Sequence, residues 1–371
     1  MTYDYLIVGS GLFGSIFARQ MTDAGAKCLV IDKRSHIGGN CYTKDVDGIH
    51  VHEYGPHIFH TNSDRVWEYM NKWTKFNHFV YRPKVRHGDK VYSFPINLFT
   101  LYQLWGVSTP QEAREKLEQV RVPIESPSNL EDWILSQIGE EIYHKFVYGY
   151  TKKQWGRDPK DLPSSIIKRL PIRLTYDDNY FEDRYQGIPI GGYTSIFTKL
   201  LDGVPTETGV DFLSDRDYLE SKAKKVIYTG PIDELFGCDI GRLDWRSLRF
   251  EHETLRGDFQ GNAAFNYTDE SVPFTRICEH KHFEFGKQDH TVITKEYPQD
   301  WNQNREKFYP INDEENNRLY SRYRERVNND RYILGGRLAD YKYYDMHQVV
   351  GSALVRSDKE IHHEHSDCKS V

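Results

Sequence analysis

The stretch "YDYLIVGSGLFGSIFARQMTDAGAKCLVIDKRSHIGGN", residues 3–40, decides the fold. An apolar run at 5–8 is followed by three glycines in G-x-G-x-x-G spacing, which are Gly9, Gly11 and Gly14. Apolar residues then recur at helical spacing, so this order predicts a strand, a tight turn that can approach a pyrophosphate, and a closely packed helix. A second apolar strand at 28–31 ends in Asp32, whose carboxylate is suited to a ribose hydroxyl. We therefore predict a Rossmann-like dinucleotide-binding unit.

The residues that follow Asp32 favour one kind of dinucleotide. The segment "KRSHIGGN", residues 33–40, adds a basic pair and a second glycine pair. A plain NAD-binding unit does not need these glycines, and the acid at position 32 argues against a 2′-phosphate. The segment resembles the extended motif of FAD-binding flavoproteins, in which the second glycine pair lets another backbone segment close over the dinucleotide. This resemblance implies FAD as the cofactor.

Composition narrows the class of protein. The chain has 371 residues, 28% of them charged, which indicates a soluble protein of two or three domains. It has no apolar run as long as a membrane span and enters a core strand at once, so we expect no signal peptide and a cytoplasmic location. A net charge of −6 gives no reason to expect nucleic acid. The five scattered cysteines include no C-x-x-C pair, which argues against a disulfide framework or a zinc knuckle.

The sequence pattern of the later parts of the chain predicts helices first and then strands. "TPQEAREKLEQV" places Thr109 as a helix cap and Pro110 at the first helical position. A second helix is predicted by an apolar stripe formed by Trp133, Ile134, Ile138, Ile142 and Phe146. Between about 205 and 310, strands of a mixed or antiparallel sheet are predicted by short alternating segments such as "VIYTGPI", "SLRFEHE", "AAFNYTD" and "HTVITKEYP". The later segment "RYILGGRLADYKYYDMHQVVGSALV" predicts a strand, a glycine pair and a helix that return to the first domain.

These patterns predict an α/β protein. It combines a discontinuous Rossmann-like FAD-binding domain with a helical insertion domain and an antiparallel β-sheet substrate domain. We assign the FAD-binding domain to residues 1–80, 187–240 and 325–360, the helical domain to 98–160, and the sheet domain to 81–97, 161–186 and 241–324. The polar and unpatterned residues 361–371 are predicted to be a disordered tail.

A series of separated motifs resembles the bacterial UDP-galactopyranose mutases over almost the full length of the chain. In chain order the motifs are "VGSGLFG", "HIGGN", "YGPHIFHTN", "GYTKKQWG", "IIKRLPIR", "DDNYFEDRYQGIPIGGYT", "FQGN", "FTRICEHKHF", "TKEYP", "FYPIND" and "GGRLADYKYYDMHQV". Any one of them can arise by chance. Their shared order makes the resemblance specific.

The resemblance implies an isomerase that interconverts UDP-galactopyranose and UDP-galactofuranose with reduced FAD. In this family N5 of the reduced flavin is the nucleophile at the anomeric carbon and UDP is the leaving group, so the flavin ends each cycle with the electrons it began with. The resemblance also implies an external reductant such as NAD(P)H, a homodimer, and a supply of galactofuranose for cell-surface polysaccharide biosynthesis.

Expulsion of UDP places charge on a diphosphate, which arginine forks and tyrosine hydroxyls are suited to stabilise. By resemblance the catalytic arginines are Arg169 and Arg276, and the diphosphate is contacted by Tyr180, Tyr309 and Tyr343. The other substrate-binding residues that the resemblance implies are Phe146 and Tyr150 at the uracil, together with Thr151, Trp155 and Asn266. The apolar stripe of its helix offers a second explanation for Phe146.

The resemblance assigns a further set of residues to the cofactor. They are Gly9, Gly11, Phe13, Gly14, Asp32, Lys33, Gly39, Asn40, His57, Ile58, Arg337, Tyr344, Asp345, Met346, His347, Gln348 and Val349. The histidines at 50, 52, 57 and 60 follow no familiar zinc spacing, so we predict no metal site.

The chain departs from the family at "YRPK", residues 81–84, where some members carry "NSP" with its asparagine toward the substrate. Tyr81 and Arg82 therefore leave the sugar open, including the 2-acetamido sugar, although "HIFHTN" favours galactose. Two other functions stay open as well. A flavin oxidoreductase of the amine-oxidase type would consume NAD(P)H or oxygen, and a non-catalytic nucleotide-sugar binder would not depend on the redox state of the flavin.

Overall fold

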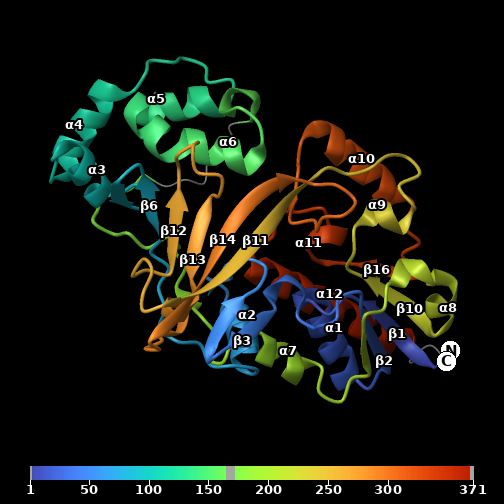
Figure 1. The fold of residues 1–371 in the computed structure, drawn as a ribbon. Helices are drawn as coiled ribbons and strands as arrows, with labels where there is room; N and C mark the ends of the chain where they lie inside the picture. The colour runs from blue at the N-terminus through green and yellow to red at the C-terminus, as the bar shows by residue number, and fades with distance from the viewer. Residues whose placement is uncertain (1, 164–171, 368–371) are drawn as a thin grey trace. The chain divides into compact units, whose positions relative to one another are not determined.

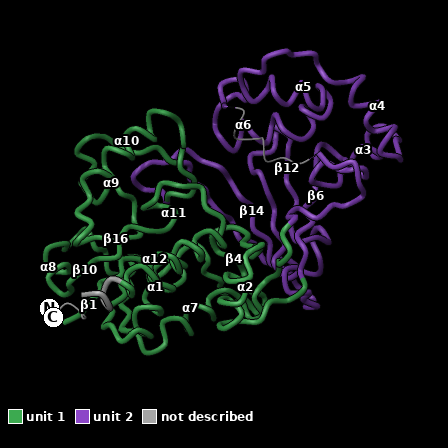
Figure 2. Tube along the Cα trace, turned by 180° about the vertical axis from the view of Figure 1, so that it is seen from behind, with its two compact units in different colours: residues 1–78, 183–245, 307–371 green, residues 79–182, 246–306 purple. Residues whose placement is uncertain are grey.

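The chain folds into two compact units, each built from separate stretches of sequence (Figure 2). The computed structural model describes residues 2–163 and 172–367. Unit 1, green in Figure 2, comprises residues 1–78, 183–245 and 307–371. Unit 2, drawn in purple, comprises residues 79–182 and 246–306.

Unit 1 is built around a parallel sheet in the strand order β16-β10-β1-β2-β9 (Figure 1). The strands are β1 (Tyr3–Val8), β2 (Cys28–Asp32), β9 (Thr206–Thr208), β10 (Ala223–Tyr228) and β16 (Tyr332–Leu334). Every residue of β2 is buried, as is expected of a parallel strand covered on both faces. The predicted Rossmann-like α/β fold is confirmed by this order of β1, glycine turn, helix and β2.

Helices pack on this sheet and bury one apolar core. The helices of unit 1 are α1 (Leu12–Asp23), α2 (Asp64–Asn71), α7 (Thr194–Leu200), α8 (Arg216–Ser221), α9 (Ile232–Leu235), α10 (Glu314–Glu325), α11 (Gly336–Ala339) and α12 (Met346–Asp367). Short strands complete the unit: β3 (Thr43–Val46), β4 (Ile49–His52), β5 (Phe59–Thr61), β8 (Tyr185–Gly187) and β15 (Tyr309–Pro310). The Tyr5 hydroxyl of β1 donates to Glu360 Oε1 of α12 at 2.9 Å, so the sheet and α12 are joined across the core.

Unit 2 contains a mixed sheet in the order β11-β14-β13-β12-β6-β7, in which only β12 and β6 are parallel among these neighbours. Its strands are β6 (Lys84–His87), β7 (Lys90–Ser93), β11 (Trp245–Arg256), β12 (Ala264–Tyr267), β13 (Arg276–Glu279) and β14 (His290–Asp300). The first residue of β11, Trp245, is counted in unit 1. The hairpin of β12 and β13 sets Asn266 opposite Arg276, and this register brings two predicted substrate residues together.

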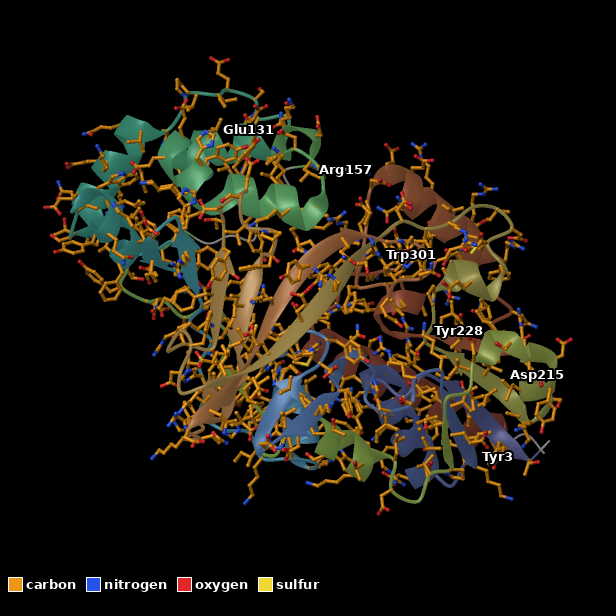
Figure 3. The ribbon with its side chains drawn as sticks, viewed as in Figure 1. Tyr3, Glu131, Arg157, Asp215, Tyr228 and Trp301 are labelled. Atoms are coloured by element: carbon orange, nitrogen blue, oxygen red, sulfur yellow. The ribbon has the colours of Figure 1, made fainter. Side chains whose placement is uncertain are left out.

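The helices of unit 2 lie where helical signals were predicted, but the helix with the predicted apolar stripe is interrupted at Gly139, which has a φ of +73°. They are α3 (Leu98–Trp105), α4 (Pro110–Val120), α5 (Leu130–Ile142), a π-helical turn (Tyr143–Tyr148) and α6 (Gly149–Trp155). Thr109 caps α4 in a capping box with Glu112, and Pro110 is its first residue, as predicted. The Tyr143 hydroxyl donates at 2.8 Å to Glu131, labelled in Figure 3, which ties the π-helical turn to the start of α5.

The structure differs from the sequence-based expectation in three respects, which are the pairing of one strand, the bounds of the domains and the C-terminal tail. The segment "VIYTGPI" begins in β10, which is a central strand of the parallel sheet, although its alternation suggested a mixed or antiparallel sheet. Residues 183–186, 241–245 and 307–324 of the predicted sheet domain group with unit 1, and residues 79–80 of the predicted FAD-binding domain group with unit 2. The predicted disordered tail is wrong for residues 361–367, because α12 continues to Asp367. Along the described part of the chain, no helix is long and apolar enough to cross a membrane.

Candidate active site

The glycine turn of unit 1 has the geometry of a phosphate-binding turn. Gly9 has a φ of +103°, and a Cβ there would lie 2.1 Å from Thr229 Oγ1. A Cβ on Gly14 would lie 1.9 Å from the carbonyl oxygen of Gly9, so α1 approaches β1 this closely only with glycine. Gly11 caps α1 without a side-chain hydrogen bond, and the first turn holds no acidic residue. The N-terminal amides of α1 are thus available to an anion.

A second backbone segment lies against this turn. A Cβ on Gly39 would lie 3.0 Å from the Cα of Gly11. The Asp32 carboxylate accepts hydrogen bonds from the Ser10 N–H at 2.8 Å, the Ser10 hydroxyl at 2.6 Å and the Arg34 N–H at 2.9 Å. Because a carboxylate offers about four acceptor positions, one remains for a ribose hydroxyl. The close glycine contact and this remaining position fit a dinucleotide.

Arg337 and His57 lie on the predicted flavin side of unit 1, where Arg337 is charged and His57 is neutral. Arg337 follows β16 and donates to the Tyr344 carbonyl oxygen at 2.8 Å. Burial lowers the pKa of His57 to about 4, and the positive charge of Arg337 acts in the same direction. His57 is therefore neutral at pH 7. Since its Nδ1 lies 2.8 Å from the Gly55 carbonyl oxygen, Nδ1 carries the proton and Nε2 is an acceptor.

The other residues predicted for the cofactor lie along the same elements of unit 1. Phe13 packs against Gly335, where a Cβ would lie 2.0 Å from the phenyl ring. The Cys41 thiol, next to Asn40, lies 3.7 Å from the Met346 sulfur and joins that loop to α12. The remaining positions are Lys33, which is exposed, Ile58, which is buried, and the turn before α12, where the Asp345 N–H donates to Gln348 Oε1 at 2.9 Å. Their contacts to a cofactor stay a prediction.

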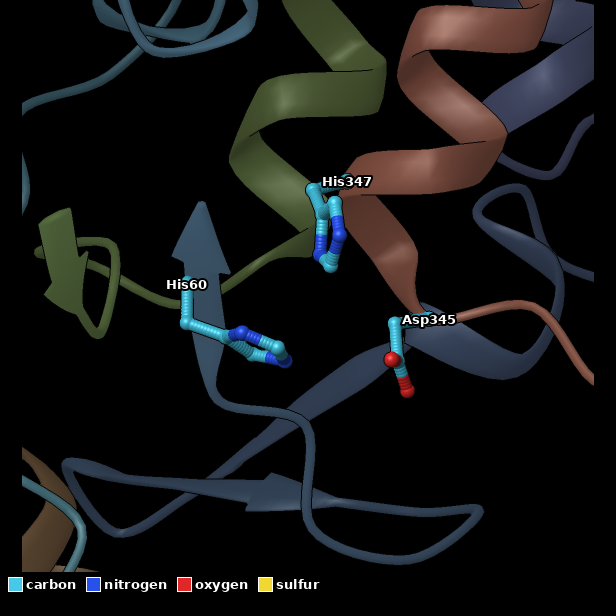
Figure 4. A group of neighbouring side chains, drawn as sticks. All are labelled: His60, Asp345 and His347. Carbon is cyan, nitrogen blue, oxygen red and sulfur yellow. The ribbon is translucent and has the colours of Figure 1, made fainter. Parts of the chain in front are cut away.

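Three residues of metal-binding types, two histidines and an aspartate, meet near the start of α12 in a group that we call the His60–Asp345–His347 cluster (Figure 4). One ligand atom from each residue lies within 4.8 Å of the other two. The rings of His60 and His347 meet edge to face at 4.8 Å, and His60 Nδ1 also hydrogen-bonds to Asp183. Burial lowers the pKa of His347, and the neighbouring His60 acts in the same direction. The spacing along the sequence gave no sign of this cluster.

Two of the predicted diphosphate tyrosines lie together in unit 1. The rings of Tyr309 and Tyr343 stack with centroids 5.1 Å apart and an interplanar angle of 15°. The guanidinium carbon of Arg337 lies 5.9 Å and 5.8 Å from the two ring centroids. Tyr343 remains 39% exposed, which leaves its ring accessible to a ligand.

Arg276 is the centre of the candidate site in unit 2. Its Nε donates to Asn266 Oδ1 at 3.1 Å, its Nη2 lies 3.4 Å from the Tyr150 hydroxyl, and its Nη1 lies 3.6 Å from Glu296 Oε2. Burial lowers the pKa of Arg276, but the Glu296 carboxylate and the neighbouring Tyr81, Tyr150 and Cys278 together outweigh this effect and hold the pKa well above its ordinary value. The guanidinium is therefore a permanent cation in a fixed orientation, which suits a diphosphate.

Tyr180 and Tyr81 lie beside one another in unit 2. Their rings meet edge to face at 5.4 Å, and the Tyr180 N–H donates to the Tyr81 carbonyl oxygen at 2.8 Å. Tyr180 is 39% exposed, whereas Tyr81 is buried. Burial raises the pKa of Tyr81, and the charge of Arg276 opposes this increase. The departure from the family at residues 81–84 thus lies close to the central arginine.

The remaining predicted substrate residues differ in exposure. Phe146 is 4% exposed and packs edge to face on Tyr92 at 5.2 Å, so its place in the helical core is established while uracil stacking stays a prediction. Thr151 is buried, and Trp155 packs on the same core. Arg169, predicted to be catalytic, lies outside the described residues.

Sequence reasoning missed Glu296 as a residue of the site. It lies in β14 opposite Arg276 and is only 3% exposed. The motif "TKEYP" contains it, and the signal that could have pointed to it was an acid in a predicted strand that also contains Val292, Ile293 and Tyr297. Such a residue is rarely buried unless a cation accompanies it.

The glycine turn, the parallel sheet and the acid at the end of β2 define a dinucleotide-binding α/β protein of the Rossmann-like class. The model of the NAD(P)-binding Rossmann-like domain matches residues 7–73. A crystal structure of reduced UDP-galactopyranose mutase shares the fold with a TM-score of 0.72 at 15% identity, and the match covers 96% of this chain and 93% of that one.

Sequence comparisons identify the family. The UDP-galactopyranose mutase model matches residues 145–343. A probable UDP-galactopyranose mutase from Klebsiella pneumoniae is 39% identical over 95% of this chain and 94% of its own. A dTDP-fucopyranose mutase from Escherichia coli is 37% identical over 94% and 96%. The chain belongs to the UDP-galactopyranose mutase family of isomerases, which confirms the predicted resemblance.

Proposed function

We propose that this protein interconverts UDP-galactopyranose and UDP-galactofuranose with reduced FAD as cofactor. The family supports the reaction class, and one observation carries the proposal for this chain. The guanidinium of Arg276 is contacted by Asn266, Tyr150 and Glu296, which come from three separate segments. Such a fixed and permanent cation is what the departure of a nucleoside diphosphate requires.

The side chains around Arg276 have distinct parts in this proposal. Glu296 pairs with Nη1 and Asn266 accepts from Nε, which together fix the plane of the guanidinium, and the remaining N–H groups of Nη1 and Nη2 are offered to the diphosphate. Tyr150 offers its hydroxyl as a neutral donor beside them, since a phenol does not ionise at pH 7. Arg169, Tyr180, Tyr309 and Tyr343 add cations and donors by family resemblance.

The glycine turn after β1, together with Gly39 and Asp32, supports FAD as the resident cofactor of unit 1. Gly11 and Gly39 leave room for the pyrophosphate, the N-terminus of α1 offers amides to it, and Asp32 retains an acceptor for a ribose. When bound and reduced, FAD would supply the nucleophilic N5 that attacks the anomeric carbon. His57 is neutral and therefore adds no charge to the predicted flavin site, while Arg337 adds a positive one.

A second candidate substrate is dTDP-fucopyranose. The dTDP-fucopyranose mutase from Escherichia coli matches the chain at 37% identity, close to the 39% of the galactose enzyme. The departure at residues 81–84 adds a reason to test it, because Tyr81 is buried beside Arg276 where a bulky ring changes the space for a sugar. The nucleotide of the 2-acetamido sugar is a further alternative substrate and should be tested in the same assay.

Chromatography of purified protein with each furanose nucleotide, with and without dithionite, tests the proposal. Conversion of UDP-galactofuranose to UDP-galactopyranose mainly in the reduced sample is the expected result. Faster conversion of the dTDP-fucose pair would reassign the substrate. Net consumption of NAD(P)H or oxygen with the sugar would point to an oxidoreductase, and binding without conversion to a nucleotide-sugar binder.

The remaining expectations are proposals of the same kind. We propose NAD(P)H as an external reductant, a homodimer, and galactofuranose supply for cell-surface polysaccharides from the cytoplasm. The division into FAD-binding, helical and sheet domains is likewise proposed. Stopped-flow reduction, light scattering and gene disruption with glycan analysis test the first three in turn.

A further inference from the structure

The turn of residues 268–275 links the two strands that carry the central pair of unit 2. It joins β12, which contains Asn266, to β13, which begins with Arg276. Within the turn, the Tyr267 N–H donates to the Thr275 carbonyl oxygen at 2.9 Å. Because Arg276 directly follows the turn, any change in its path moves the guanidinium.

The ammonium of Lys153 lies inside this turn. Its Nζ donates to four backbone carbonyl oxygens, those of Tyr267 at 2.8 Å, Asp269 at 2.7 Å, Val272 at 3.0 Å and Phe274 at 3.0 Å. An ammonium has only three hydrogens, so the four oxygens surround it in the manner of ligands around a cation. Backbone carbonyls replace the hydration shell of K⁺ in a similar way.

The same helix also reaches Arg276 directly. Lys153 lies in α6, three residues after Tyr150, whose hydroxyl is 3.4 Å from Arg276 Nη2. A Cβ on Gly149 would lie 2.1 Å from the Thr268 carbonyl oxygen, so α6 packs directly on the turn. Helix α6 thus positions Arg276 in two ways. Tyr150 contacts its guanidinium, and Gly149 and Lys153 contact the turn that precedes it.

The charges around the ammonium favour its protonated form. Burial lowers the pKa of Lys153 to about 8, and the carboxylates of Asp269 and Glu270 oppose this decrease. The four carbonyl dipoles act in the same direction as the carboxylates. Lys152 pairs with Glu270 at 3.1 Å, and Arg246 Nη2 donates to the Lys153 carbonyl oxygen at 3.2 Å.

We propose that Lys153 is a positioning residue, whose ammonium acts as a tethered monovalent cation that organises the 268–275 turn and thereby orients Arg276 toward the diphosphate of the nucleotide sugar. The orienting part of this inference rests on the proposed function. The cation cage itself is a property of the fold and does not depend on turnover.

Chemical rescue tests the role of the positive charge. Lys153→Ala opens the space of the side chain, Lys153→Met fills it without charge, and Lys152→Met is the matched control, because its exposed ion pair contributes little. We measure kcat, KM and the thermal unfolding midpoint with n-butylammonium and, as a neutral counterpart, with n-butanol. Circular dichroism checks that each variant is folded.

Both Lys153 variants are expected to lose about 10- to 100-fold in kcat, as misplacement of a catalytic group does, while Lys152→Met changes it by about twofold or less. Butylammonium should raise kcat and the unfolding midpoint of Lys153→Ala but not of Lys153→Met, and butanol should do neither. Wild-type kcat in Lys153→Met, equal rescue by butanol, or no rescue by either compound would overturn the proposal.

Two further arms keep the outcome decisive. If Lys153→Ala does not fold, the kcat of Lys153→Met decides, because methionine preserves the packing of the lysine stem. If the wild-type protein converts none of the nucleotide sugars, the proposed function fails, but a butylammonium-specific rise in the unfolding midpoint of Lys153→Ala still establishes the cation cage. Absence of that rise would refute the cage separately.

Discussion

Replacement of Arg276 should separate its proposed part in catalysis from its part in stability. Arg276 pairs with Glu296 at 3.6 Å, and Glu296 is 3% exposed. Two unit charges at this distance interact by about 5 kcal/mol at an effective dielectric constant of about 20. Arg276→Ala leaves the Glu296 carboxylate buried without this partner, which costs about 3–5 kcal/mol. We therefore expect this variant to unfold at a clearly lower urea concentration than the wild type.

The double variant Arg276→Ala/Glu296→Gln removes the unpaired charge and should regain most of the lost stability. It should not regain turnover, because loss of one preorganised donor to the developing charge costs about 10²–10³ in kcat. Urea unfolding and chromatography of the nucleotide sugar under reducing conditions measure the two effects. Arg249→Ala is the matched control, since the Arg249–Glu251 pair is exposed. Recovery of kcat together with stability in the double variant would refute the assignment.

Three other perturbations test the fold and the site. Gly14→Ala places a Cβ 1.9 Å from a carbonyl oxygen and should yield protein with little bound flavin by absorbance, whereas Gly351→Ala, which meets only an ordinary contact, should retain it. Glu279→Gln should lower the unfolding free energy by up to about 3 kcal/mol at pH 7. Burial raises the pKa of Glu279, but hydrogen bonds from His282 and two backbone amides hold it at about 2. This stabilisation is present above about pH 4.5 and is lost as the pH falls toward 2. If the unfolding free energies of Glu279→Gln and the wild type differed by the same amount at pH 7 and pH 3, the explanation would be contradicted. We also expect elemental analysis to find no stoichiometric metal at the His60–Asp345–His347 cluster and EDTA to leave turnover unchanged; one equivalent of bound zinc would overturn this expectation.

The parts of the fold that sequence predicted well depend on local rules. The glycine turn after β1 and the capped start of α4 at Thr109 are specified by neighbouring residues, so each could be read without knowledge of the rest of the chain. The burial of Ile134 and Ile138 follows from helical periodicity in the same way, whereas Ile142 is buried after a break in the helix at Gly139.

The parts that sequence predicted poorly depend on distant partners. Strand β10 pairs with β1, which lies far away in the chain, and nothing in "VIYTGPI" specifies that neighbour. The burial of Glu296 is likewise set by Arg276 across the sheet, and the four carbonyls around Lys153 belong to a turn more than a hundred residues later. The periodicity of the sequence carries no information about which distant residues come into contact.

The interrupted layout of unit 1 has a consequence for how the protein is made. The chain passes from one unit to the other four times, and β1 is completed by β10, while Tyr5 bonds to Glu360. At a synthesis rate of about 5–20 residues per second, roughly 20–70 s separate the emergence of β1 from that of α12. During this time the nascent glycine turn lacks the covering helix α12 and, until residue 228 is synthesised, the neighbouring strand β10. The core of the dinucleotide unit is thus completed only after α12 has been synthesised, and removal of α12 would remove part of that core.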